Sequence, residues 1–232
     1  MRDKIMSEQY FIDFIAEENA RIQRFSTKLA NGEIRADRIF SVEQRVNSLK
    51  FGVFIANYSL GADLSSLKSD FDEILVEFPR FWTETSSYIN MVWMMSIAIM
   101  LEVEQEKLCG LTDLLDKYDR HDALLDFFSD YKLRGIIALN NRSFSCPVPY
   151  AELGKVIENE QERPKLLKTY VDKKWYPGHK KFGICDVHKS KEKIYSGYWS
   201  FESGALAKIL DIDDSGLQGS NYYPYDLAHF SW

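Results

Sequence analysis

Cys185 and His188 stand at a spacing that can bind metal. Two residues separate them, which is half of a tetrahedral zinc site. No second pair of ligands follows at a suitable spacing. No nucleophile elbow or glycine motif, which would support a Cys–His nucleophile, flanks the two residues. Glycine-rich phosphate loops and the common hydrolase and metalloprotease motifs do not occur either. We therefore expect neither a metal nor another cofactor.

Carboxylates among aromatic residues near the end of the chain are the second candidate for chemistry. Glu202 and Asp213, together with nearby tyrosines, could form the acid–base group of a helical hydrolase. Alternatively, the carboxylates of this region are structural, because a buried carboxylate needs hydrogen-bond donors and phenol and indole groups supply them. The four residues concerned are Glu202, Asp213, Asp214 and Asp226. The structural interpretation is favoured, and no catalytic residue is assigned.

Charge is divided unevenly along the chain, whose net charge is −6. Nine acids and three bases lie between residues 101 and 131, whereas ten bases and three acids lie between residues 163 and 193. If the acidic region is helical, its aspartates from 119 to 130 follow a 3, 4, 4 spacing and share one stripe. The stripe is either a solvated helix face or a docking surface for a basic protein, whose association it would accelerate. The candidate contacts are Asp113, Asp116, Asp119, Asp122, Asp126 and Asp130.

The composition argues against a nucleic-acid or membrane partner. A net negative charge is unusual for a protein whose main partner is a phosphate backbone. The most apolar run, residues 91–101, has eleven residues, whereas a membrane span needs about 20, so we expect a buried core helix there. Three isolated cysteines and the lack of a secretory signal indicate reduced thiols and a cytoplasmic protein.

Hydrophobic periodicity predicts helices along most of the chain. Gly61 is a stop signal behind the second helix, and Pro79 is expected to end the third. The expected helices cover residues 11–29, 39–60, 64–78, 82–106, 108–118, 121–128, 131–139, 150–158, 164–175, 199–210 and 225–230. Residues 181–195 form the one segment where a short hairpin also fits.

These elements predict an all-α protein. Long antiparallel helices would form a bundle in the first part, and shorter helices around an aromatic cluster would form the second. We expect an N-terminal helical domain over residues 1–112 and a C-terminal helical domain over residues 113–232.

The end of the chain carries the most specific pattern. YWSFE begins at Tyr198, ALAK at Ala205, DDS at Asp213 and YYPYDL at Tyr222. This block resembles the C-terminal signature of the PoNi-type immunity proteins. The signature positions are Tyr198, Trp199, Phe201, Glu202, Asp213, Asp214, Tyr223, Pro224 and Asp226. The first part of the chain is similar to the companion domain of the same proteins, through Arg2-Asp3-Lys4, Tyr10-Phe11 and Tyr58-Ser59-Leu60-Gly61.

The resemblance implies a non-catalytic cytoplasmic protein encoded beside a toxin that type VI secretion or another polymorphic-toxin route delivers. Toxins of such systems include DNases. The expected partner is therefore a cognate effector toxin, with a DNase as the first candidate and occlusion of its active site as the mode of inhibition. The signature residues are aromatic and structural in character, so they are not carried over as a contact surface. A helical hydrolase and a non-catalytic helical scaffold remain the alternatives.

Overall fold

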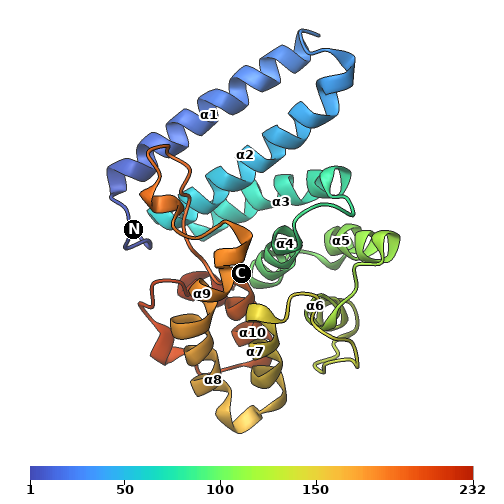
Figure 1. Ribbon diagram of the computed structural model, residues 1–232, viewed down its shortest axis with the longest axis vertical. Coiled ribbons are helices and arrows are strands. Elements are labelled where there is room, and N and C mark those ends of the chain that lie inside the picture. The colour runs from blue at the N-terminus through green and yellow to red at the C-terminus, as the bar shows by residue number, and fades with distance from the viewer. Residues whose placement is uncertain (232) are drawn as a thin grey trace. The chain divides into compact units, whose positions relative to one another are not determined.

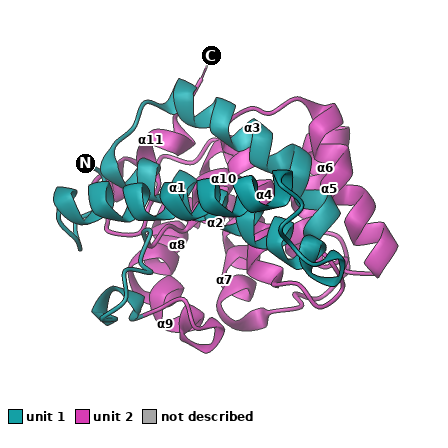
Figure 2. Cartoon of the chain, turned by 90° about the horizontal axis from the view of Figure 1, so that it is seen from above, with its two compact units in different colours: residues 1–81, 186–197 teal, residues 82–185, 198–232 magenta. Residues whose placement is uncertain are grey.

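The computed structural model describes residues 1–231, and their regular secondary structure is helical, with no strand (Figure 1). The expected all-α class is confirmed. The chain forms two compact units (Figure 2): residues 1–81 and 186–197 make unit 1, and residues 82–185 and those from 198 onward make unit 2. The division into domains at residue 112 stays a prediction, because contacts do not establish which segments fold independently.

Unit 1 is built on three helices, α1 (Glu8–Ala30), α2 (Ile39–Leu60) and α3 (Leu64–Phe81). α2 packs against both of the others. Ser7 caps α1 by accepting a hydrogen bond from a backbone N–H of the first turn. Gly61 ends α2 in the left-handed conformation, with φ at 106°. The helix starts and stops therefore follow from local residue types.

Aromatic side chains fill the interior of unit 1. The buried residues include Phe11, Phe14, Phe54 and Phe71. Pro79, which was expected to end α3, instead lies inside its last turns, and the helix continues to Phe81. Proline is tolerated there because only one helical N–H is lost and few residues follow it in the helix.

The hairpin that fitted residues 181–195 is not formed. This segment holds short 3-10 turns and irregular backbone. The Tyr10 hydroxyl donates to the Tyr195 carbonyl and accepts from the Tyr195 N–H, both at 3.0 Å. The Ser59 hydroxyl donates to the Ser196 carbonyl at 2.7 Å. Helix side chains thus satisfy backbone groups that a second strand would otherwise have to pair.

Unit 2 is organised around α4 (Tyr88–Met100), an apolar helix that is buried along nearly its whole length. It packs extensively against α10 (Phe201–Leu210). The two helices approach closely at Gly204, where an added Cβ would lie 2.6 Å from the Met100 sulfur. The apolar run over residues 91–101 is therefore a core helix, as expected. Among the residues described, no helix is long and apolar enough to span a bilayer.

α4 is shorter than the helix expected over residues 82–106. Before it, the Ser86 N–H donates to the Thr83 carbonyl at 3.0 Å, and the Ser86 hydroxyl accepts from the Thr83 N–H at 2.9 Å. After it, Glu102 has a left-handed backbone, with φ at 52°. Local hydrogen bonds of this kind compete with helix and set its ends.

α4 also contacts α5 (Gln105–Tyr118) and α6 (Ala123–Arg134). The single helix α6 replaces the two short helices expected over residues 121–128 and 131–139. It ends at Gly135, whose φ of 68° terminates the helix within the second expected element.

Short helices and an aromatic cluster complete unit 2. The helical segments are α7 (Pro147–Glu158), α8 (Arg163–Thr169), a π-helical turn (Tyr170–Trp175), α9 (Tyr176–His179) and α11 (Tyr225–Ala228). The centroid of the Tyr222 ring lies 5.2 Å from that of Trp175 and 5.3 Å from that of Tyr176. The expected aromatic cluster is present.

Candidate functional site

The six candidate aspartates lie on α5, on α6 and in the turn between these helices. The expected continuous stripe is broken, because Asp119 ends α5 with φ at 47° and Asp122 begins α6 with an extended backbone. The exposed members are Asp113, Asp116 and Asp119, the buried ones are Asp122 and Asp126, and the partly buried one is Asp130. Only part of the set is therefore open to a partner.

Asp122 holds the start of α6. Its Oδ1 accepts the N–H groups of Leu124 and Leu125 at 3.1 and 2.8 Å. Its Oδ2 accepts the Tyr88 hydroxyl at 2.6 Å and the Ser145 N–H at 3.0 Å. Burial and the nearby charge of Asp122 hold the pKa of Tyr88 well above its ordinary value, so its O–H remains a donor. Four donors offset the desolvation of this carboxylate.

His121 joins the turn to both helices. Its Nδ1 lies 2.6 Å from Asp126 Oδ1, and its Nε2 lies 2.8 Å from Asp116 Oδ1. Burial alone would lower the pKa of His121, but the hydrogen bonds that its ring donates to Asp126 and Asp116 outweigh burial and raise the pKa. The protonated ring, which this shift favours, donates to both carboxylates. Asp116 is thereby held in place while its side chain stays 75% exposed.

The exposed acids of α5 and its end form what is hereafter the acidic surface: Glu106, Asp113, Asp116 and Asp119. Asp113 follows Glu106 by seven positions, about two helical turns, which places them on the same side of the helix. Neither Asp113 nor Asp119 forms an ion pair with any residue in the described part of the chain. Their charge remains available to a partner.

The signature residues near the end of the chain lie mostly inside unit 2. The buried ones are Tyr198, Trp199, Phe201, Glu202, Asp214, Tyr223 and Pro224, and the exposed ones are Asp213 and Asp226. Phe201 meets Trp93 edge to face, with ring centroids 5.7 Å apart. Asp214 accepts a hydrogen bond from the Tyr223 hydroxyl and lies 3.2 Å from His229 Nε2. The buried part of the signature therefore directs packing.

Glu202 is fully buried at the start of α10. Its Oε1 accepts the hydroxyl groups of Tyr170 at 2.7 Å and Ser200 at 2.9 Å. Burial raises the pKa of Glu202 to about 7, although these donors oppose the shift. The nearby Trp175 indole also lowers the pKa of Glu202. Trp175 Nε1 and Glu202 Oε2 nevertheless do not form a hydrogen bond of ordinary geometry.

His179 is the neutral counterpart of Glu202 in the same interior. Its Nδ1 donates to the Trp175 carbonyl at 2.7 Å, and its Nε2 accepts the Tyr150 hydroxyl at 2.9 Å. Burial lowers the pKa of His179 to about 4. This region therefore favours the uncharged form of both its acid and its base.

The residues proposed for a hydrolase are not brought together. Glu202 is buried, whereas Asp213 lies on the surface and accepts the Ser215 N–H at 3.2 Å. An acid–base pair must face one substrate, so this placement does not support that alternative. Within residues 1–231, no group of three or more potential ligands could hold a metal ion.

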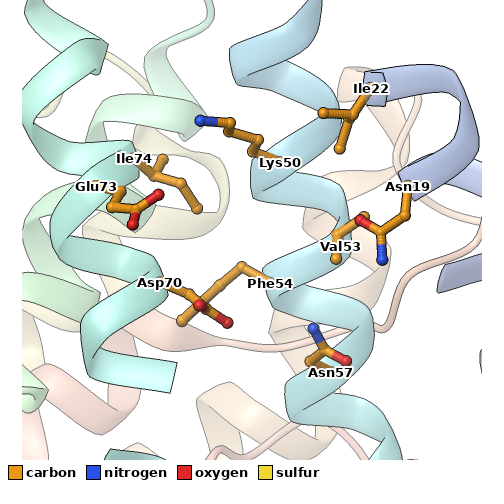
Figure 3. A pocket seen from close by; sticks show the side chains of 9 residues that line it. All are labelled: Asn19, Ile22, Lys50, Val53, Phe54, Asn57, Asp70, Glu73 and Ile74. Carbon is orange, nitrogen blue, oxygen red and sulfur yellow. The ribbon is translucent and has the colours of Figure 1, made fainter. Parts of the chain in front are cut away.

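A cleft of about 300 Å³ lies between α1, α2 and α3 in unit 1 (Figure 3). Phe54 and Ile74 form its apolar wall, and Lys50, Asp70 and Glu73 project toward it. Burial, assisted by the neighbouring charge of Glu73, raises the pKa of Asp70. This cleft could not be predicted from the sequence. The three-residue spacing of Asp70 and Glu73 indicates a shared side of one helix, but it carries no information about a space enclosed by three helices.

Two family models match the chain. The N-terminal model of the PoNe immunity protein (PoNi) family matches residues 2–112, and the C-terminal model matches residues 120–227. The chain therefore belongs to the PoNe immunity protein family, which makes it an immunity protein with a toxin as its partner.

The fold is similar to that of protein PA2201 from Pseudomonas aeruginosa, which is known from a crystal structure. The TM-score is 0.71 at 17% sequence identity, and the match covers 98% of this chain and 89% of that chain. At this identity the likeness shows a shared fold. No curated protein matches the chain significantly.

Asp122→Ala should lower the free energy of unfolding by about 2–4 kcal/mol, because it removes the cap of α6 and leaves the Tyr88 hydroxyl and backbone N–H groups without an acceptor. Asp113→Ala, on the exposed side of α5, should change it by less than about 0.5 kcal/mol. Urea unfolding at pH 7, followed by circular dichroism, measures both. Equal losses would contradict the separate roles of the two aspartates.

Glu202→Gln should change how stability depends on pH. The folded-state pKa is about 7 against an ordinary value of 4.5, so the stabilisation from the protonated acid is complete below pH 4.5 and is lost as pH rises to 7. Glutamine cannot ionise, so the variant should gain about 3 kcal/mol relative to the parent across this interval. His179 titrates in both proteins and cancels in the difference. Parallel stability curves between pH 4.5 and 7.5 would rule out the proposed shift.

Proposed function

We propose that this immunity protein neutralises a DNase toxin in the cytoplasm by covering the toxin's active site with the acidic surface. A nuclease needs a positive cleft to hold phosphate, and the acidic surface offers complementary charge to such a cleft. The observation that carries the proposal is the exposed, unpaired state of Asp113 and Asp119. The three free cysteines fit a reducing compartment, where a toxin delivered by type VI secretion would act.

The acidic surface is supported from within unit 2. Asp122 fixes the start of α6, and His121 fixes the position of Asp116. A carboxylate that is already positioned loses less side-chain freedom on binding than a mobile one. The buried aspartates therefore serve the proposed contact by holding the exposed ones, without touching the toxin.

Asp113→Lys combined with Asp119→Asn should slow association with a catalytically inactive toxin about tenfold at low salt, because steering by opposite charge is lost. The asparagine tolerates the left-handed backbone at position 119. The difference from the parent should shrink at high salt, where charges are screened. Stopped-flow or biolayer kinetics at several salt concentrations measure this.

Glu158→Lys is the matched control, since Glu158 is exposed at the end of α7 and outside the acidic surface. Its association rate should stay within about twofold of the parent, as for a charge outside the contact. If the double variant associates as fast as the control, the acidic surface is not the contact.

Occlusion predicts competition between this protein and DNA for the toxin. Duplex DNA added to the inactive toxin should weaken binding in proportion to the DNA concentration, because the two ligands would share one cleft. Isothermal titration at increasing concentrations of a short duplex measures the effect, with the same salt and no DNA as the control. A stable ternary complex of toxin, DNA and this protein on gel filtration would refute occlusion.

A further inference from the structure

Unit 1 has a second cavity, and none of its lining residues belongs to the acidic surface. It has a volume of about 200 Å³ and is lined by residues of α1, α2 and the segment 186–197, which lies beside α1 in Figure 1. Phe14 and Leu49 give it apolar walls, and Ile194, 50% exposed, lines it as well. The cavity therefore combines apolar walls with polar and charged side chains.

Glu18 places an unsatisfied acceptor at this cavity. The residue lines it and is only 6% exposed. Its Oε1 accepts from Arg21 at 2.6 Å, but its Oε2 has no hydrogen-bond partner among the described residues. A buried carboxylate oxygen without a donor is unfavourable. A guest that brings a donor would relieve this.

Gly52 keeps the cavity open. It lies inside α2, where glycine is less favourable than alanine. Its backbone is not left-handed, and an added Cβ would meet no atom within 4 Å. Gly61 and Gly204, by contrast, are required by a positive φ and by close packing. The absence of a side chain at Gly52 therefore leaves part of the cavity volume empty.

The lining selects the kind of guest. The volume suits one large side chain and is below that of pockets for drug-sized ligands, roughly 300–1,000 Å³. A lysine would meet the like charges of Arg21, Arg45 and Lys193. An ionised acidic side chain has no donor, so it would leave Glu18 Oε2 unsatisfied. An aliphatic side chain would leave Glu18 Oε2 without a donor.

An aromatic ring with a hydrogen-bond donor meets all of these conditions. Its ring would pack on Phe14 and Leu49, and its O–H or N–H would donate to Glu18. The Arg45 side chain, which has no ion pair in the described structure, could lie against the ring face. We infer that this cavity receives a tyrosine or tryptophan side chain of the toxin, as an anchor of the complex. The inference rests on the proposed function.

Two substitutions of Gly52 test the anchor. Gly52→Phe fills the cavity and should weaken binding of the catalytically inactive toxin about 100-fold, mainly through faster dissociation. Gly52→Ala, the matched control, leaves most of the volume and should bind within about threefold of the parent. Equal affinity of the phenylalanine variant and the parent would overturn the anchor. If the parent itself fails to bind any toxin, the proposed function fails instead.

Glu18→Gln tests the donor without filling the space. Glutamine keeps an acceptor for Arg21 but turns an N–H group toward the guest, so binding should weaken about tenfold. Thermal unfolding of each variant checks that it is folded. If Gly52→Phe does not fold, Glu18→Gln decides: unchanged affinity overturns the inference, and a loss that Glu158→Lys does not share supports it.

Discussion

A helix that is apolar on every side must be covered on every side, and α4 imposes this constraint on unit 2. Its residues offer water no polar face, so α5, α6 and α10 all pack against it. Tyr88, at its first position, links α4 to the start of α6, because its hydroxyl donates to the buried Asp122. The same bond that anchors α4 thus fixes the start of α6, and with it the turn that ends the acidic surface.

Two buried titratable groups of unit 2, Glu202 and His179, are favoured in their neutral forms. Glu202 and His179 have pKa values displaced in opposite directions by the same cause, which is burial. Between pH 4.5 and 6.5 the acid contributes less stability as pH rises, whereas the base contributes more. The two trends oppose each other, so unit 2 keeps two buried titratable groups without a steep net dependence on pH in that interval.

The sequence predicts those helix ends and buried segments that depend on neighbouring residues alone. The end of α2 at Gly61 and the burial of α4 follow from a glycine stop and an unbroken apolar run. The break at Asp119 could not be predicted from the spacing of the aspartates. That spacing is the same whether Asp119 continues a helix or ends it in the left-handed conformation. The cavity beside Gly52 needs the segment 186–197, which is distant in sequence. Long-range packing of this kind leaves no periodic signal.

The family signature and the proposed contacts occupy different parts of the molecule. Most of the signature is buried, so it maintains packing and leaves the exposed positions free to differ. A protein built this way can keep one fold while its surface is matched to one toxin. Charge at Asp113 and Asp119 would govern how fast the toxin is captured, and a ring beside Glu18 would govern how long it is held. Because the two proposed contacts use separate residues, either quantity would change without rebuilding the core that carries them.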